Sequence, residues 1–297
     1  MIIITYCYKI IKWCWLRPFS SCLVVCIIFI CLGLENAQAR RFYQWLEGPV
    51  EESIAERIPP PPGYRRMTHL NSSFGAWLAG LPLQPERPKV HLFNGQEKVN
   101  QRAHHSIIQI DTGNRDLQQC ADAVIRLRAE YLFDTDRKEA IEFHFTSGDL
   151  ARWVDWQNGI RPMIEDNKVL WKKTGSQDKG YLNFRKYLNI VFAYAGSYSL
   201  SRELVPVPDP SLVEPGDVFI QGGHPGHAVI VVAVARNDAG QRCFLIAQSY
   251  MPAQEIHILK NPASWSGPWY RARSSGPLQT PEWNFKYEDL RRFPTSP

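Results

Sequence analysis

Four short apolar runs follow one another toward the end of this chain, and residues that favour turns separate them. They lie at 218–221, 228–235, 243–249 and 255–259, with Gly, Pro, Asn or Asp between them. Runs of about four to eight apolar residues bounded in this way are typical of β-strands. Because connections this short join antiparallel neighbours, the pattern predicts one antiparallel sheet of sequential strands.

Helical periodicity precedes these strands and is clearest at 117–133. Apolar side chains recur there with a spacing of about 3.6 residues. They are Ala121, Val124, Ile125, Ala129 and Leu132, joined by the aliphatic part of Arg128. We expect Asp116 to cap this helix and Gln119 to complete a capping pair. Further helices are expected at 72–81, 149–156 and 180–195, and further short strands at 90–93, 107–110 and 141–145. Helices followed by an antiparallel sheet indicate an α+β fold.

The first 39 residues differ from the rest of the chain. A basic front of Lys9, Lys12 and Arg17 is followed by an uncharged apolar run at 19–34 and then by Ala37-Gln38-Ala39. Basic, apolar and small residues in this order are typical of a secretory signal peptide. We therefore expect export to the periplasm or the extracellular space after cleavage near Ala39. The alternative is an uncleaved leader that anchors the protein to a membrane.

The remaining residues, 40–297, are expected to form a single globular domain. Its core is expected at 101–260, with an N-terminal extension at 40–100 and a C-terminal segment at 261–297 that wraps the core. Without the leader the formal net charge falls from +5 to +3, because three basic residues and one acidic residue are lost. So small an excess of positive charge argues against a nucleic-acid partner.

Two of the seven cysteines, Cys120 and Cys243, lie outside the leader. In an exported protein, one interpretation of such a pair is a single disulfide. Strand parity argues against it, because Cys243 and Gln248 face opposite sides of a regular strand. If Gln248 faces a catalytic histidine, Cys243 faces away and does not easily reach Cys120, unless a bulge interrupts the strand.

Cys120, near the predicted helix start, is also a candidate nucleophile. The free N–H groups and the dipole of a first helical turn stabilise a thiolate. His227 opens the run at 228–235 and is the candidate base, held by a buried strand. Gln248 is the one polar residue deep in the run at 243–249, and its amide could orient the imidazole. The alternatives are an inert core cysteine, a core histidine and a structural amide.

Three further residues are candidates for contact with a substrate. The backbone N–H of Cys120, together with the side chain of Gln118 or Gln119, could bind an oxyanion. His224 precedes His227 across a Pro-Gly turn and could line the mouth of a pocket. His224 and His227 supply only two ligands for a metal, so we expect neither a metal nor another cofactor.

Two other features have ordinary explanations. Asp111-Thr112-Gly113 imitates an aspartic-protease signature, but that chemistry needs a second carboxylate and the chain has no second motif of this kind. A turn accounts for these three residues. The aromatic residues of the C-terminal segment could stack on a glycan or pack on the core. They are Trp265, Trp269, Tyr270 and Trp283.

The order of the candidate residues resembles a known group of enzymes. Cys120 at a helix start, Pro-Gly-Asp-Val-Phe-Ile at 215–220, Gly-His-Ala-Val-Ile-Val at 226–231 and then Gln248 resemble the NlpC-type cell-wall peptidases of the papain-like superfamily. The resemblance implies a papain-like core in which Cys120, His227 and Gln248 are catalytic. Those enzymes typically cleave amide bonds in peptidoglycan stem peptides.

This chain departs from the NlpC-type pattern in two ways. Gln119 stands where an acidic residue customarily precedes the cysteine, and the gap between Cys120 and His227 is longer than usual.

A second resemblance spans nearly the whole of 40–297. It rests on motifs at 77–78 (Trp-Leu), 117–123 (Leu-Gln-Gln-Cys-Ala-Asp-Ala), 126–131 (Arg-Leu-Arg-Ala-Glu-Tyr), 248–254 (Gln-Ser-Tyr-Met-Pro-Ala-Gln) and 280–283 (Thr-Pro-Glu-Trp). These motifs are similar to a bacterial family designated domain of unknown function 4846. This resemblance implies no particular activity.

Together these observations predict an exported papain-like cysteine amidase or peptidase that acts on a cell-envelope amide, such as a peptidoglycan stem peptide. The partner is then an envelope polymer or peptide, with membrane contact only through an uncleaved leader. The alternative is a non-catalytic envelope protein that keeps the fold and binds glycan or peptide.

Overall fold

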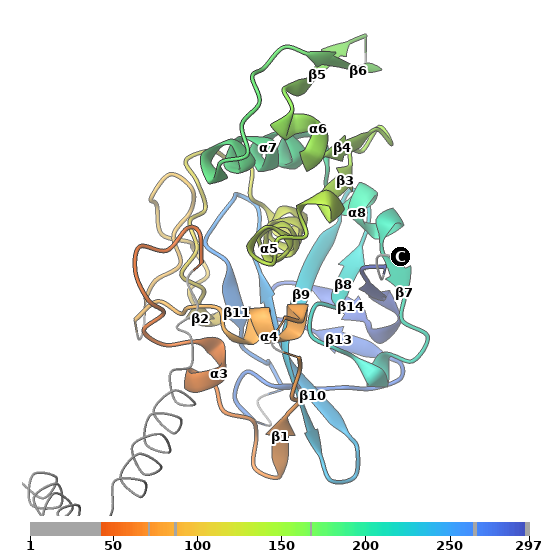
Figure 1. Ribbon diagram of the computed structural model, residues 1–297. Coiled ribbons are helices and arrows are strands. Elements are labelled where there is room, and N and C mark those ends of the chain that lie inside the picture. The colour runs from red at the N-terminus through yellow and green to blue at the C-terminus, as the bar shows by residue number, and fades with distance from the viewer. Residues whose placement is uncertain (1–42, 71, 86–87, 167, 264–265, 295–297) are drawn as a thin grey trace, which may run out of the picture. The chain divides into compact units, whose positions relative to one another are not determined.

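The computed structural model describes residues 43–294, apart from 71, 86–87, 167 and 264–265 (Figure 1). The leader predicted at 1–39 and the aromatic Trp265 lie outside the described residues. From Tyr43 onward the chain forms one compact unit. No helix in the described part of the chain is both long enough and apolar enough to cross a membrane.

A large antiparallel sheet is the centre of this unit. Its strands are β1 (Tyr64–Arg66), β2 (His104–Ile107), β7 (Val205–Pro206), β8 (Val218–Gln221), β9 (His227–Asn237), β10 (Arg242–Gln248), β11 (His257–Leu259), β12 (Tyr270–Arg271) and β15 (Leu290–Arg292). Hydrogen bonds order them as β2-β11-β10-β9-β8-β15-β7, with β1 beside β9 and β12 beside β10. The four predicted runs are therefore neighbours, as β8 to β11, and each pair is antiparallel. The predicted α+β class is confirmed.

Helices cover one face of this sheet. They are α3 (Ile54–Arg57), α4 (Phe74–Ala79), α5 (Cys120–Asp134), α6 (Trp153–Gln157), α7 (Tyr181–Tyr194) and α8 (Ser197–Glu203), with short 3-10 helices at Lys138–Ala140, Pro210–Leu212 and Tyr287–Asp289. Helix α5 packs on β9, and α7 lies beyond α5 (Figure 1). The rings of Phe133 and Phe184 stack between α5 and α7 with their centroids 4.4 Å apart.

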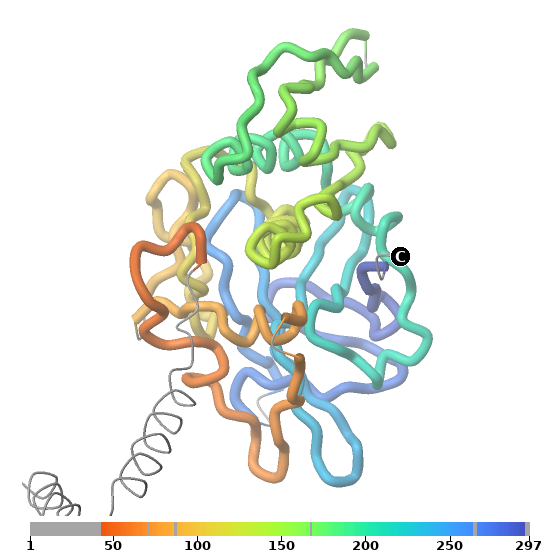
Figure 2. Tube along the Cα trace, viewed as in Figure 1, coloured from red at the N-terminus to blue at the C-terminus, as the bar shows by residue number. Residues whose placement is uncertain are grey.

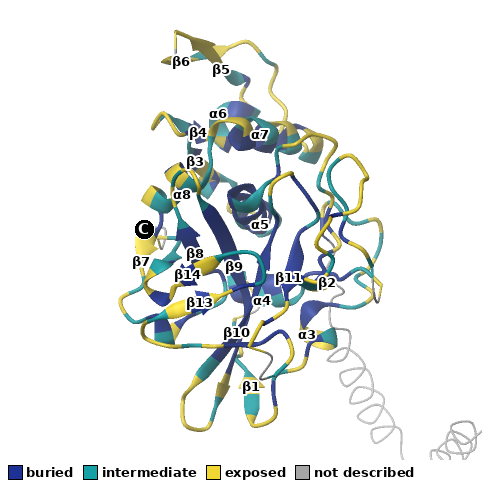
Figure 3. Ribbon diagram, turned by 180° about the vertical axis from the view of Figure 1, so that it is seen from behind, coloured by how far each residue is buried: buried dark blue, intermediate teal, exposed yellow. Residues whose placement is uncertain are grey.

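Helix α5 is buried on all sides. Every residue at 121–133 is buried except Arg128, as the dark colour of this helix in Figure 3 shows. The predicted period identifies the apolar positions of the helix, but its burial extends to charged positions as well. Because the start of α5 lies on β9, the residues at this helix end are brought to the sheet.

Side chains of β9 and β10 alternate between the two faces of the sheet. Those that meet the helices are Ala228, Ile230, Val232, Cys243, Leu245 and Ala247. Those on the other face are Val229, Val231, Phe244 and Ile246, and they pack with Leu278, Phe285 and Leu290 of the C-terminal segment. Strands buried on both faces have nearly continuous apolar sequences, which explains the pattern of the four runs.

A bulge interrupts β9 rather than β10. The pairing of the two strands shifts between Leu245 and Ile246, and Val232 is the residue of β9 left without a partner in the register. A bulge re-aims the side chains of the strand that carries the extra residue. Alternation along β10 is therefore unbroken, and Cys243 and Gln248 face opposite sides, as parity predicts.

The C-terminal segment contributes to the sheet as well as covering it. Strands β13 (Pro277–Gln279) and β14 (Asn284–Lys286) form a hairpin, and β15 pairs with both β8 and β7. Trp269 and Tyr270 are buried, at 1% and 3% exposure, so these two rings pack on the core instead of forming a glycan platform.

Several predicted boundaries are wrong. The strand predicted at 107–110 is β2, which begins and ends three residues earlier, and 90–93 makes only isolated bridges. The helix predicted at 149–156 starts as a strand: β4 (Leu150–Arg152) pairs with β3 (Glu142–His144). Gly148, with a φ of 94°, makes the turn between them, a conformation that favours glycine.

The elements that were not predicted include a hairpin and a helix in the middle of the chain. The hairpin of β5 (Ile160–Glu165) and β6 (Lys168–Lys173) projects beyond α6 (Figure 2). Helix α8 follows α7 directly and packs against β3 and β8. The helices predicted at 180–195 and 72–81 are present as α7 and α4, each slightly shorter than predicted.

Candidate active site at the start of helix α5

Cys120 is the first residue of α5, and Gln119 is its N-cap. The Gln119 backbone N–H donates to Oδ2 of Asp122 at 3.0 Å, so Asp122 satisfies a donor that the helix cannot. The helix therefore begins three residues later than predicted, and Asp116 is not its cap. Oδ1 of Asp116 instead accepts from the Gln119 side chain at 3.0 Å and from the Ala253 N–H at 2.7 Å. These bonds tie the loop before the helix to the segment after β10.

The sulfur of Cys120 lies against the start of β9. Cys120 as a residue is partly exposed. Burial and the charge of Asp122 raise the pKa of the thiol to about 11, while hydrogen bonds from the Ala228, Ala121 and Cys120 N–H groups lower it. The predicted effect of the helix start is thus present but outweighed. At neutral pH the thiol is protonated.

Asp122 affects the thiol in a way that depends on its own proton. Burial raises the pKa of Asp122 well above its ordinary value, against the lowering effect of its backbone hydrogen bonds. A protonated Asp122 no longer repels a thiolate at Cys120. The desolvation of the sulfur is then the main reason why the pKa of Cys120 is high.

His227 and Gln248 contact each other across β9 and β10. Nε2 of His227 lies 2.8 Å from Oε1 of Gln248, and the two residues are 2% and 1% exposed. Burial lowers the pKa of His227 to about 4; Gln248 and Glu282 raise it, and Lys98 lowers it further. The imidazole is therefore neutral at neutral pH.

Three aromatic rings surround the imidazole of His227. The ring centroids of Tyr250, Trp283 and Phe285 lie 4.7, 5.2 and 5.8 Å from it. Tyr250 also lies close enough to Cys120 to feel its charge: burial, then Glu282, then Cys120 raise the pKa of this phenol. Of Trp269, Tyr270 and Trp283, Trp283 is the one whose ring lies against His227.

The structure thus brings together Cys120 and the strand that carries His227. The link is Ala228, which follows His227 directly and whose backbone N–H is close enough to the thiol to lower its pKa. Within the described residues, no hydrogen bond joins the sulfur of Cys120 to the imidazole of His227. Gln248 completes the cluster from the end of β10.

The three predicted substrate contacts are placed differently. Gln118 is 1% exposed; its Oε1 accepts from Nη1 of Arg126 at 2.9 Å, and its Nε2 has no partner among the described residues. Nε2 of the Gln119 side chain donates to Oδ1 of Asp116. His224 is exposed in the turn between β8 and β9, outside the buried cluster.

Both cysteines are free. Cys243 faces away from Gln248, yet it faces α5, the helix that begins with Cys120. Distance along the sheet, rather than a difference of face, keeps the two sulfurs apart. Cys243 pairs with Ala235, and seven residues of β9 separate Ala235 from Ala228, about 20 Å of strand. A disulfide needs Cα atoms within roughly 7 Å of each other.

A buried polar network behind the start of α5 was not predicted. Arg126 and Glu130 form an ion pair with Nε and Oε1 2.5 Å apart, and neither side chain is exposed. Arg126 also binds Asp111 at 3.1 Å and the Gln118 side chain, which lies two residues before Cys120. Asp111 makes a second ion pair with Arg185 at 2.7 Å. The carboxylate of the Asp-Thr-Gly motif therefore pairs with two arginines.

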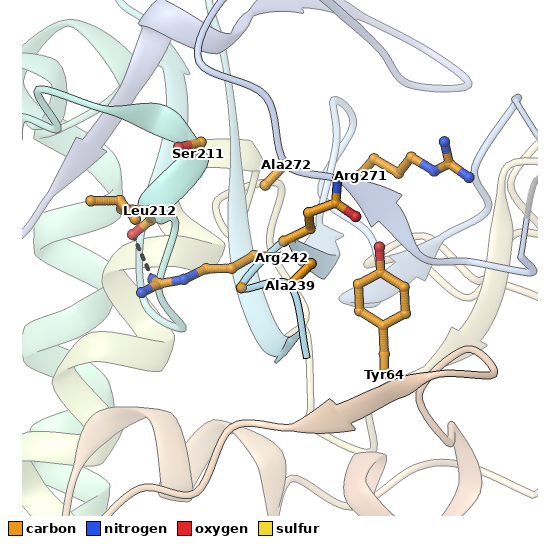
Figure 4. Close-up of a pocket in the computed structure, with 9 residues that line it drawn as sticks. Tyr64, Ser211, Leu212, Ala239, Arg242, Arg271 and Ala272 are labelled. Atoms are coloured by element: carbon orange, nitrogen blue, oxygen red, sulfur yellow. Dashed lines mark hydrogen bonds between the residues drawn. The ribbon is translucent and has the colours of Figure 1, made fainter. Parts of the chain in front are cut away.

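Two surface pockets, each of about 380 Å³, lie elsewhere. One is at the far end of β10, where Nη1 of Arg242 donates to the Leu212 carbonyl at 2.9 Å (Figure 4). The other is lined by residues that include His144 and Glu203, and burial raises the pKa of Glu203 to about 7. Neither pocket includes Cys120 or His227. No group of three potential metal ligands occurs among the described residues.

The fold and the cluster define an α+β protein whose central helix begins with a cysteine close to Ala228, the residue that follows the histidine of a buried histidine–glutamine pair. The chain belongs to the family described as Domain of unknown function (4846), whose model matches residues 54–292. No curated protein and no solved structure matches the chain.

Proposed function

We propose that this protein is a papain-like cysteine amidase or peptidase. The contact between His227 and Gln248, at the start of the strand whose Ala228 backbone N–H lowers the pKa of Cys120, is the observation that carries the proposal. A carbonyl oxygen can only accept a hydrogen bond, so Nε2 of His227 holds the proton when it faces Oε1 of Gln248. Nδ1 then has a free lone pair and can act as a base toward the thiol.

The reaction follows from these roles. Nδ1 of His227 takes the thiol proton while the sulfur of Cys120 attacks the carbonyl carbon of an amide. The backbone N–H of Cys120 and the unpaired amide nitrogen of Gln118 donate to the oxyanion. As the C–N bond breaks, the imidazolium returns the proton to the leaving amine. Water, deprotonated by His227, then hydrolyses the thioester and restores the thiol.

The resting pair is neutral. A thiol pKa of about 11 and an imidazole pKa of about 4 place the proton on the sulfur of Cys120. Transfer to His227 costs about 10 kcal/mol before the mutual attraction of thiolate and imidazolium is counted. Proton transfer from Cys120 to His227 therefore has to occur together with attack of the sulfur on the bound substrate. In this respect the protein differs from an enzyme whose thiolate–imidazolium pair is already formed before the substrate binds.

The proposed substrate is a cell-envelope amide, such as a peptide bond in a peptidoglycan stem. The leader expected at 1–39 would bring the protein to the envelope, and the resemblance to NlpC-type peptidases names the bond. Tyr250 is partly exposed beside Cys120 and could contact the substrate.

Incubation with purified muropeptides, followed by mass spectrometry of the products, tests this proposal. The wild-type protein is expected to cleave an amide bond, whereas Cys120→Ala and His227→Ala lose the activity. Cys243→Ala is the matched control, because this thiol is free but lies far from the site. Full activity of Cys120→Ala would show that the assigned nucleophile is wrong.

A non-catalytic envelope protein that binds glycan or peptide is the second candidate. The high pKa of Cys120 and the low pKa of His227 favour it, since both disfavour a reactive thiolate. In the same experiment this candidate predicts retention of intact muropeptides on the protein with no cleaved product.

A further inference from the structure

We propose that Glu282 and His257 are positioning residues that fix the Gln248 amide and thereby select the His227 tautomer with the proton on Nε2. The catalytic meaning of this tautomer depends on the proposed function. The tautomer itself is a property of the folded protein and can be measured without a substrate.

The carboxylate of Glu282 sets the first constraint. Nε2 of Gln248 lies 2.9 Å from Oε2 of Glu282. An ionised carboxylate only accepts hydrogen bonds, so the group of Gln248 that faces it must be the NH₂ group. This orientation directs Oε1 of Gln248 at His227.

His257 sets the second constraint independently. Its Nδ1 lies 2.8 Å from the carbonyl oxygen of Glu255, which can only accept, so Nδ1 carries the proton. Nε2 of His257 then has a lone pair, and it lies 3.4 Å from Nε2 of Gln248. Burial lowers the pKa of His257 to about 3, so this ring stays neutral at neutral pH.

Both hydrogens of the Gln248 amide nitrogen therefore have an acceptor. A flipped amide would set Oε1 against a carboxylate and a ring lone pair, and both contacts would be repulsive. Because Gln248 is buried, water could not compensate for the lost hydrogen bonds. Oε1 thus remains toward His227 and accepts from its Nε2–H.

Lys98 and Asn100 contact the carboxylate of Glu282 and fix its position. Nζ of Lys98 forms an ion pair with Oε2 of Glu282, and Nδ2 of Asn100 donates to Oε1 at 3.1 Å. The Lys98 side chain is 7% exposed and that of Glu282 is 13% exposed, so the ion pair lies largely out of contact with water. The positive charge of Lys98 opposes protonation of His227.

A tight turn presents Glu282 to the cluster. The Thr280 hydroxyl donates to the Trp283 carbonyl at 2.7 Å and accepts from the Trp283 N–H at 3.0 Å. Glu282 then meets Gln248, while the ring of Trp283 lies against His227. The motif at 280–283, which the sequence alone connects with no chemistry, thus supplies two contacts to the candidate site.

Histidine-selective ¹⁵N labelling of the full chain, with two-bond ¹H–¹⁵N correlation spectra at pH 7, tests the inference. In the wild-type protein we expect His227 with its proton on Nε2 and His257 with its proton on Nδ1. In Glu282→Gln, the new amide can donate to Oε1 of Gln248 when the Gln248 amide is flipped. The NH₂ group of Gln248 then faces Nε2 of His227, which must accept, so a substantial fraction of His227 should carry the proton on Nδ1. Glu288→Gln, at an exposed glutamate of the same segment, should leave both rings unchanged.

Either of two results would overturn the inference. One is a wild-type His227 with its proton on Nδ1, a measurement that does not depend on whether a variant folds. The other is a folded Glu282→Gln protein in which the His227 tautomer is unchanged.

Activity assays separate this inference from the proposed function. If the protein cleaves muropeptides, Glu282→Gln should lower kcat at least tenfold with little change in KM, because a base in the wrong tautomer cannot accept the thiol proton. A tautomer change without any cleavage by the wild-type protein would support the positioning role and remove the proposed function. Cleavage that depends on Cys120, with no tautomer change in Glu282→Gln, would support the proposed function and remove the positioning role.

Discussion

Arg126 and Glu130 stand one turn apart on α5, and no part of either side chain reaches solvent. Burial works against the charge of Arg126, but Glu130, Tyr181 and Asp111 outweigh it and raise the pKa of this guanidinium. Arg126 therefore stays charged, whereas burial raises the pKa of Glu130 against the lowering effect of Arg126. The guanidinium holds the segment that leads into Cys120 through Gln118.

Removal of one member of this pair should strongly destabilise the protein. Arg126→Met leaves the carboxyl of Glu130 buried without its cation, and we expect a loss of about 3–5 kcal/mol in the free energy of unfolding. Urea denaturation measures the loss. Arg115→Met, at an exposed arginine, is the control and should change stability little.

A double variant separates the ion pair from simple packing. Arg126→Met with Glu130→Leu removes both charges, so it should recover much of the stability lost by Arg126→Met alone. Equal losses in the single and double variants would contradict the assignment of this loss to an uncompensated charge.

Glu203 should make the protein less stable as the pH rises. Burial and the neighbouring Glu142 raise its pKa from 4.5 to about 7, against the hydrogen bond from the His144 N–H. A folded-state pKa above the unfolded one gives stability that is present at low pH and lost as pH rises through about 7. Between pH 5 and pH 8 this loss is about 2–3 kcal/mol.

Glu203→Gln tests that effect with little structural change. The amide oxygen can still accept from the His144 N–H, a bond of 2.7 Å in the native protein, but it does not titrate. Relative to the wild type, the variant should gain about 2–3 kcal/mol of unfolding free energy between pH 5 and pH 8. Glu139→Gln, at an exposed site, should show no such gain, and equal pH slopes for Glu203→Gln and wild type would exclude the effect.

The sheet could be predicted from the sequence because its strands are local and buried on both faces. Each of β8 to β11 is a short apolar run, and each pairs with a neighbour in the chain. Strands such as β15 could not be predicted in the same way. Leu290–Arg292 has one buried and two partly exposed residues, and it joins β8 from a point about seventy residues further along the chain.

The candidate site also contains residues that could be predicted from the sequence and residues that could not. Cys120, His227 and Gln248 stand out because each is a polar or reactive residue in an apolar context. Glu282 and Lys98 gave no such signal: both lie in polar stretches, and only the folded chain brings them within reach of Gln248. The high pKa of Cys120 was also missed, because desolvation depends on what packs around the sulfur.

Acid should destabilise the protein through His227. Its pKa falls from 6.5 to about 4 in the folded state, chiefly through burial. Between these values the unfolded chain binds a proton that the folded chain does not, so stability is lost as pH falls from about 6.5 toward 4. The loss at pH 4.5 is about 2–3 kcal/mol relative to pH 7.

Comparison of wild type with His227→Gln isolates this contribution from other groups that titrate in acid. The variant should lose less unfolding free energy than the wild type between pH 7 and pH 4.5, with His224→Gln as the exposed control. If wild type and His227→Gln lose stability in parallel, the imidazole is not held neutral by the fold.

The rate at which iodoacetamide alkylates Cys120 measures the ionised fraction of its thiol at each pH. With a pKa of about 11, roughly one thiol in a thousand is ionised at pH 8, so alkylation should be slow and should rise about tenfold per pH unit up to pH 10. Mass spectrometry of the peptide that contains Cys120 follows this thiol alone. Asp122→Asn keeps an acceptor for the Gln119 N–H but cannot ionise, so it should speed alkylation only at pH values where Asp122 carries its charge.

The pH dependence of this alkylation also bears on catalysis. Asp136→Asn, at an exposed carboxylate, should leave the rate unchanged. A fast rate already constant between pH 6 and pH 8 would contradict the raised pKa. It would mean that the attraction between thiolate and imidazolium outweighs the desolvation of Cys120 and His227, and that the proton rests on the histidine. A rate that follows the thiolate fraction instead supports proton transfer coupled to attack on the substrate.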